Sequence, residues 1–104
     1  MRIYEDGLQV VRLLKPVIEG IARCDSDLAR QLRRCASSMV LNIAEGSYAR
    51  GGNRRGLYSI ALGSTKETRA CLDVAMALGY LEDVDAEIGL LLEAIGGVLY
   101  CLTR

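Results

Sequence analysis

The residue types most able to do chemistry gather in one short stretch, EGSYARGGNRRGLYS, at residues 45–59. Two of its glycines, Gly46 and Gly51, have the spacing found in phosphate-binding loops. However, Gly52 and Asn53 follow where such a loop needs a lysine and a hydroxyl residue to hold the terminal phosphate and its magnesium ion. The segment before the glycines also has a helical pattern, whereas the loop requires a strand. The sequence therefore excludes this kind of nucleotide site.

Arginines in the same stretch indicate a different chemistry. A turn between two helices needs glycine, so we expect Gly46 or Gly51 to adopt positive φ and Asn53 to cap the next helix. A turn does not need guanidinium groups, which bind phosphate or carboxylate in a bidentate manner. The arginines concerned are Arg50, Arg54 and Arg55. They favour a contact with nucleic acid or with an acidic protein surface.

The residue types present argue against a catalytic site or a metal-binding site. The chain has no histidine, which removes Ser–His and Cys–His pairs and the Glu-x-x-His pattern of ferritin-like bundles. Its four cysteines form no Cys-x-x-Cys pair, and we expect Cys35, Cys71 and Cys101 to be small buried hydrophobes in a reducing compartment. We expect Glu45 and Glu67 to be held by hydrogen bonds between helices, with Asn42 or an arginine as donor. The sequence predicts no enzyme, no metal and no cofactor.

Composition predicts one soluble helical domain over residues 1–104. Hydrophobic residues make up 51% of the chain and aromatic residues only 5%, which suits aliphatic packing between helices. The start does not resemble a secretory signal, and no uncharged apolar run reaches the roughly 18 residues that span a bilayer. We therefore expect a cytoplasmic protein without a membrane contact.

Charge is divided unevenly, although the net charge is zero. Residues 23–55 hold seven arginines and three acids, whereas residues 67–104 hold seven acids and two arginines. This division serves either nucleic-acid binding or association of the basic part with the acidic part. A solvated surface with local salt pairs is the alternative.

Apolar residues recur at steps of three and four in four segments. The first runs from about 7 to 22, the second follows capping residues at 24–27, the third runs from near 53 to Gly79, and the fourth follows Glu82 and Asp83. Pro16 predicts a kink or a late start for the first helix. Because the connections are short, we expect an all-α, up-down-up-down antiparallel four-helix bundle.

The outer face of the second helix carries the basic residues. On a helical wheel Arg30, Arg34, Leu41 and Tyr48 fall within about 40° of each other, opposite the core stripe, and Arg33 borders them. Arginine suits phosphate and tyrosine stacks on bases, so this face predicts nucleic-acid binding. The alternative is that these arginines pair with acids of another helix.

The third helix has a wider apolar arc than one core needs. Its expected core stripe is Leu57, Ile60, Ala61, Ser64, Thr68, Cys71, Leu72, Ala75 and Leu78. A second stripe lies beside it and consists of Tyr58, Leu62, Thr65, Arg69, Met76 and Tyr80. We expect this surplus to bury against a partner chain, since Met and Tyr are frequent in such contacts. A more tightly packed bundle would also bury part of this apolar surface within the chain.

Several segments together resemble a known family. They are QLRRCASSMVLNIAEGSYARG at 31–51, SIALGSTKE at 59–67 and ALGYL at 77–81, which cover about half of the chain. The combination is similar to bacterial four-helix bundle proteins encoded in intervening sequences of 23S ribosomal RNA genes, some of which carry a ribosomal-protein label. A related branch is the accessory protein of diversity-generating retroelements.

The resemblance implies a homo-oligomer, a pentamer, with a role in binding RNA or DNA. The sequence and the resemblance together predict a non-enzymatic bundle that binds nucleic acid with little sequence specificity. The alternative is a protein-interaction module, such as an accessory subunit of a polymerase or reverse transcriptase. The predicted nucleic-acid contacts are Arg30, Arg33, Arg34, Tyr48, Arg50, Arg54 and Arg55. The predicted oligomer interface is Leu41, Tyr58, Leu62, Arg69, Met76 and Tyr80, and the predicted structural motif is Asn42, Glu45, Gly46 and Glu67.

Overall fold

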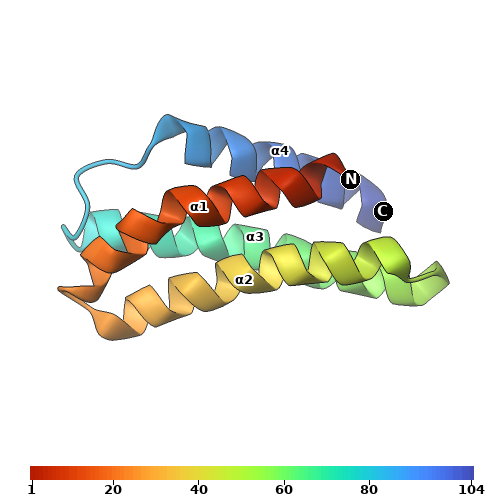
Figure 1. The fold of residues 1–104 in the computed structure, drawn as a ribbon, viewed down its shortest axis with the longest axis horizontal. Coiled ribbons are helices and arrows are strands. Elements are labelled where there is room, and N and C mark those ends of the chain that lie inside the picture. The colour runs from red at the N-terminus through yellow and green to blue at the C-terminus, as the bar shows by residue number, and fades with distance from the viewer.

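The computed structural model describes residues 1–104 and contains four helices and no strand. They are α1 (Arg2–Ala22), α2 (Ser26–Tyr48), α3 (Gly51–Ala77) and α4 (Ala86–Thr103). The helices lie side by side along the long axis of the molecule (Figure 1). The main contacts join α1 to α2, α2 to α3, α3 to α4 and α4 to α1, so each helix has two neighbours. The predicted all-α class is confirmed.

Helix α1 begins earlier than the sequence pattern suggested. It starts at Arg2 and not near residue 7. The buried stripe that includes Gly7 and Val10 extends one turn further toward the N-terminus, to Ile3. Pro16 lies inside the helix on its exposed side. The prediction that the first helix starts late, at Pro16, is therefore wrong.

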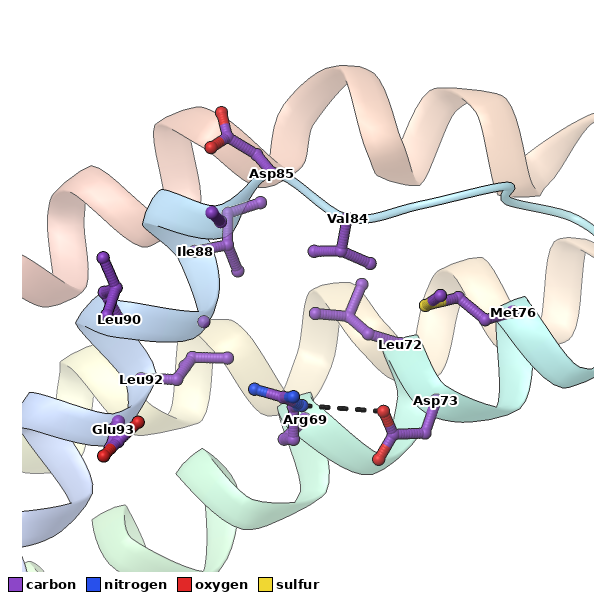
Figure 2. Close-up of a pocket in the computed structure, with 12 residues that line it drawn as sticks. Arg69, Leu72, Asp73, Met76, Val84, Asp85, Ile88, Leu90, Leu92 and Glu93 are labelled. Carbon is purple, nitrogen blue, oxygen red and sulfur yellow. Dashed lines mark ion pairs between the residues drawn. The ribbon is translucent and has the colours of Figure 1, made fainter.

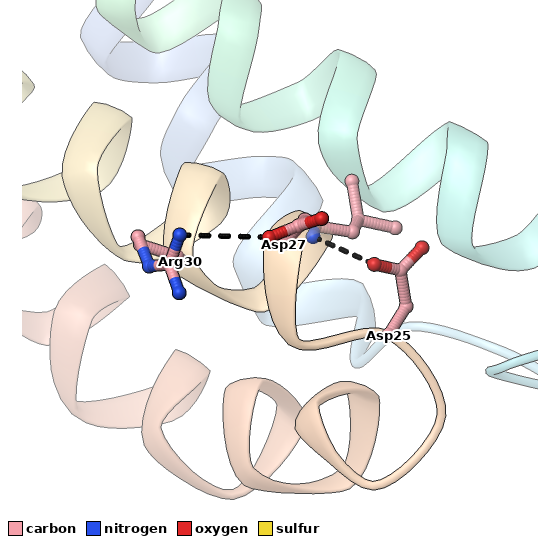
Figure 3. Close-up of polar contacts among 4 residues, drawn as sticks. Asp25, Asp27 and Arg30 are labelled. Carbon is pink, nitrogen blue, oxygen red and sulfur yellow. Dashed lines mark hydrogen bonds and ion pairs between the residues drawn. The ribbon is translucent and has the colours of Figure 1, made fainter.

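The α1–α2 turn is closed by Asp25, as its capping sequence predicted. One carboxylate oxygen of Asp25 accepts a hydrogen bond from the Leu28 backbone N–H at 3.0 Å (Figure 3). The other oxygen accepts one from the Tyr80 hydroxyl at 3.2 Å. Burial and this bond both raise the pKa of Tyr80. Asp25 thus ties the start of α2 to the end of α3.

The α2–α3 turn uses its glycines differently from the prediction. Gly51 has φ of 61°, which confirms one of the two candidates for positive φ. Gly46 lies inside α2, and Asn53 lies inside α3 rather than at its cap. The cap position of α3 is Arg50, whose side chain makes no capping bond.

The connection between α3 and α4 is longer than predicted, so the fourth helix begins later in the sequence. Gly79 has φ of 80°, and the Tyr80 N–H donates to the Ala75 carbonyl at 2.9 Å, which ends α3 in a left-handed cap. Helix α4 begins only at Ala86, where Asp85 accepts from the Glu87 N–H at 2.8 Å. The start predicted directly after Asp83 is therefore too early.

One shared core fills the bundle, but α3 is rotated in it relative to the prediction. Ile60 and Leu78 were expected in the core and are 53% and 56% exposed. Tyr58 and Thr65 were expected on a partner-facing stripe and are buried. Thr65 lies beside Gly96 of α4, whereas Tyr58 lies against Gly46 of α2 and near Met1, so the chain covers much of the surplus itself.

Candidate nucleic-acid interface and outer surfaces

The α2–α3 turn presents three unpaired functional groups. Tyr48 is 88% exposed, and Arg50 and Arg55 are also exposed. The chain contains two ion pairs, Arg30–Asp27 and Arg69–Asp73, so no carboxylate lies within 4.0 Å of Arg50 or Arg55. These two guanidinium groups and the phenol ring are therefore free to contact a ligand.

Arg54, between these arginines, is used inside the chain. Its Nε donates to the Gly46 carbonyl at 3.0 Å and its Nη2 to the Ser47 carbonyl at 3.3 Å. The guanidinium also lies over the Tyr58 ring, 5.9 Å from its centre. Arg54 thus adds donors to carbonyl groups of the last turn of α2, where the Gly46 carbonyl otherwise accepts only a 3.3 Å bond from the Ala49 N–H. It is a capping residue, which the sequence pattern did not distinguish from its neighbours.

The arginines of α2 fall into two kinds. Arg30 pairs with Asp27 of the same helix at 3.5 Å (Figure 3), a surface pair of small energetic weight. Arg33 and Arg34 are exposed and have no carboxylate within 4.0 Å. The predicted alternative, in which acids of another helix neutralise these groups, is therefore not what the structure contains.

Arg34 stands at the edge of a polar pocket of about 370 Å³ between α2 and α3. Gln31 donates to Glu67 across this pocket at 3.3 Å, and the Ser64 hydroxyl donates to the Ser38 hydroxyl at 2.8 Å. Glu67 is thus held between helices, as predicted, although the donor is Gln31 and not Asn42 or an arginine.

The other motif residues have separate roles. The Asn42 amide donates to the Ser38 carbonyl at 2.8 Å and to its hydroxyl at 3.1 Å, within α2. Gly46 is buried against Tyr58. The Glu45 carboxylate is exposed and makes no hydrogen bond or ion pair, so the expectation of an interhelical bond is wrong for this residue.

Two thiols meet in the interior beneath the polar pocket. The Sγ atoms of Cys35 and Cys71 lie 4.0 Å apart, and the Thr68 hydroxyl donates to Cys35 Sγ at 3.4 Å. Burial, and then the neighbouring Cys35, raise the pKa of Cys71 to about 12. The Cys71 thiol therefore stays protonated at neutral pH. Cys101, expected to be buried with them, is exposed because it lies on the outer side of α4.

The predicted oligomer interface of α3 lies beside its own α4. Arg69 and Met76 line a pocket of about 380 Å³ between α3 and the start of α4, where Leu72 and Ile88 form the apolar wall (Figure 2). Leu62 is half-buried in the neighbouring groove. Tyr58 is 1% exposed and cannot contact a partner. Tyr80 is half-buried against the core and bonded to Asp25.

The apolar outer face of α4 was not predicted from the sequence. Only four of the 18 residues of α4 are buried, and Leu90 is 68% exposed. By length and composition α4 is apolar enough to cross a membrane, although it carries Glu87 and Glu93. The available signal was that apolar residues continue round the whole helix and do not form one stripe. This face is a candidate for protein contact, and so, separately, is Leu41, which is 59% exposed on α2.

Comparison with known proteins agrees with the arrangement of four helices. The sequence pattern of the 23S rRNA-intervening sequence protein family matches residues 1–100. The chain belongs to this family. The resemblance inferred from residues 31–51, 59–67 and 77–81 is therefore confirmed. No curated protein matches the chain.

A solved relative has the same fold. It is the crystal structure of a protein with unknown function from the S23 ribosomal protein family of Bacteroides thetaiotaomicron VPI-5482. The two structures superpose with a TM-score of 0.83 over 98% of each chain, at 16% sequence identity. At this identity the likeness shows that the two chains share the four-helix fold.

Proposed function

We propose that this family member is a non-enzymatic, cytoplasmic, up-down-up-down bundle that self-associates and binds RNA or DNA. Binding uses the α2–α3 turn, with Arg50 and Arg55 on phosphates and Tyr48 stacked on a base. Arg33 and Arg34 extend the basic surface along α2. Arg54 is left out of the contact set because its donors are already used at the end of α2.

The observation that carries the proposal is the exposed, unpaired state of Arg50, Arg55 and Tyr48 at one turn. Both termini lie toward the same end of the bundle as this turn (Figure 1), so Arg2 and Arg104 add to its positive charge. The opposite end holds the acidic α3–α4 connection with Glu82, Asp83 and Asp85. The bundle is 43 Å long, several Debye lengths at physiological salt, so these carboxylates repel an anionic ligand only weakly at the turn.

Self-association strengthens this surface. A single chain offers few phosphate contacts, so its affinity for nucleic acid is low. Copies that align with their turns at one rim bring these contacts together, and the later contacts then form at high effective concentration. The pentamer implied by family resemblance is the assembly we propose, and the exposed apolar side chains of α4 support self-contact.

A salt titration tests the nucleic-acid proposal. Affinity for single-stranded RNA and for duplex DNA is measured from about 50 to about 200 mM salt, for the wild type and for Arg50→Ala/Arg55→Ala. We expect the variant to bind more weakly and to have a log–log salt slope that is shallower by about 0.7–0.9 for each phosphate that it no longer neutralises. Arg12→Ala, at an exposed arginine of α1, is the matched control and retains wild-type binding. Unchanged affinity in the double variant would refute the proposal.

The alternative function is a protein-interaction module that serves a polymerase-type enzyme. The exposed apolar side of α4 favours a protein contact of some kind. A co-purification experiment with and without nuclease distinguishes the two, since a partner held through nucleic acid is released after digestion. A partner that survives digestion and high salt would favour the alternative.

A further inference from the structure

The polar pocket between α2 and α3 gives a small molecule access to one of the two core thiols. Cys35 lines this pocket of about 370 Å³ and is 5% exposed. Three of the other lining residues, Gln31, Arg34 and Glu67, are exposed, so the pocket opens to solvent. Cys71 is 4% exposed and is not among the lining residues. A small polar molecule that enters the pocket therefore reaches Cys35 and not Cys71.

The sulfur of Cys35 is held in place by hydrogen bonds. The Cys35 thiol donates to the Leu32 carbonyl at 3.3 Å, and its Sγ accepts from the Thr68 hydroxyl at 3.4 Å. The Thr68 hydroxyl is itself anchored to the Ser64 carbonyl, 2.8 Å away in the preceding turn of α3. These contacts fix the position of the Cys35 sulfur in the wall of the pocket.

The pocket also has hydrogen-bond donors that the chain does not use. No carboxylate lies within 4.0 Å of the Arg34 guanidinium, although Glu67 lines the same pocket. The Ser38 hydroxyl accepts hydrogen bonds from Ser64 at 2.8 Å and from Asn42 at 3.1 Å, and it donates none. Arg34 and Ser38 can therefore both donate to an oxygen-rich molecule that lies beside Cys35.

Cys71 is placed to react with Cys35 once Cys35 has been oxidised. The two Sγ atoms lie 4.0 Å apart, and a disulfide bond requires them to approach by about 2 Å more. Burial raises the pKa of Cys71 to about 12, so its thiol is protonated at neutral pH. Because the thiolate is the reactive form, Cys71 does not itself react with an oxidant in solution. The two thiols therefore differ in access and in reactivity.

We propose that Cys35 is a modification site for hydroperoxides that enter the polar pocket, and that Cys71 converts the product to a disulfide. This inference is independent of nucleic-acid binding and of self-association. The Cys35 sulfur attacks one oxygen of hydrogen peroxide, and the O–O bond breaks. The other oxygen leaves as water with the thiol proton, while Arg34 and Ser38 donate hydrogen bonds to it. Cys35 is thereby oxidised to a sulfenic acid and the peroxide is reduced.

The second step joins the two helices. The Cys71 sulfur attacks the sulfenic sulfur of Cys35, and the S–O bond breaks. The hydroxyl group leaves as water with the Cys71 proton, so each peroxide consumed gives a disulfide and a second water. The disulfide links α2 to α3 across the core, between residues that are 36 positions apart in the chain.

Peptide mapping tests the site in a chain without its exposed thiols. The chain is Cys24→Ser/Cys101→Ser, and it is treated with hydrogen peroxide in the folded state. Trypsin then places Cys35 and Cys71 in separate peptides, because it cuts after Arg50. We expect the loss of both remaining free thiols and a linked peptide pair that a reducing agent separates. The link should form within one chain, at a rate that does not depend on protein concentration.

Variants in the same background test the order of the two steps. In Cys71→Ala the sulfenic acid should persist at Cys35, where dimedone captures it. In Cys35→Ala the Cys71 thiol should stay reduced. Circular dichroism checks that both variants are folded, and the linked peptide pair in the parent chain decides the proposal without them. Oxidation of Cys71 in folded Cys35→Ala would overturn the proposal, and so would a link that forms only in urea.

A surface variant tests the role of the pocket. Arg34→Ala removes a charged donor from the pocket and should slow the oxidation of Cys35 by about tenfold or more. Lys66→Ala is the matched control, because Lys66 is exposed on α3 and does not line this pocket, and it should retain the parent rate. Equal rates in the two variants would overturn the assignment of this pocket as the peroxide site.

Discussion

Gly46 of α2 lies directly against the ring of Tyr58 of α3. A Cβ on Gly46 would stand 2.5 Å from Tyr58 Cε1 and 2.7 Å from Cδ1, closer than real side chains approach. The ring is almost fully buried, and Arg54 lies over it while bonding to the Gly46 carbonyl. The glycine of the Asn-Ile-Ala-Glu-Gly segment therefore makes room for an aromatic ring at the α2–α3 corner.

Gly46→Ala should destabilise the bundle. The added methyl group must displace a buried ring beneath Arg54, and such overpacking costs about 1–3 kcal/mol. Urea unfolding followed by circular dichroism measures the decrease. Gly56→Ala is the matched control, because its Cβ meets nothing within 4 Å and alanine favours a helix, so stability should rise by up to about 1 kcal/mol. Equal effects from both substitutions would contradict this role for Gly46.

Arg54 and Arg55 should show opposite phenotypes although they are neighbours. Arg54→Ala removes two hydrogen bonds to the end of α2 and should lower the free energy of unfolding by about 1–2 kcal/mol. Arg55→Ala removes an exposed, unpaired side chain and should leave stability within about 0.5 kcal/mol. Thermal unfolding of the two variants gives this comparison. In the proposed function Arg55→Ala weakens nucleic-acid binding, so measuring both properties separates capping from ligand contact.

Stability should fall at alkaline pH through Cys71. Its pKa is raised from 9.0 to about 12, so the folded state holds the thiol proton more tightly than the unfolded state. This contribution is fully present below pH 9 and disappears as the pH rises from 9 toward 12. Unfolding free energies at several pH values should decline less steeply for Cys71→Ala. Cys101→Ala, at an exposed thiol, should keep the wild-type slope.

Ser38→Ala should cost more stability than Ser37→Ala. The Ser38 hydroxyl accepts hydrogen bonds from Ser64 and from Asn42, and Ser64 is buried. Its removal leaves the Ser64 hydroxyl without an acceptor, at a cost of about 1–3 kcal/mol. Ser37 is exposed and makes no side-chain hydrogen bond, so its replacement should be nearly neutral. Chemical denaturation of the two variants provides the measurement, and similar midpoints would rule out this network as a source of stability.

The sequence by itself determined the helical class, the approximate helix positions and the family. It did so because the three- and four-residue spacing of apolar side chains is a property of each segment alone. A cap within residues 24–27 and a positive φ at Gly46 or Gly51 were local predictions of the same kind, and the structure selects Asp25 and Gly51.

The tertiary structure decided which side of each helix is covered. Helix α4 lies against Thr65 and Gly46 of α2 lies against Tyr58, so both side chains are in the core while Ile60 stays exposed. It also decided that Arg54 caps α2 while Arg50 and Arg55 have no carboxylate within 4.0 Å, because a guanidinium finds its partners across the turn. Helical periodicity gives the angle between side chains on one helix, but only the packing of neighbouring helices determines which angle faces solvent.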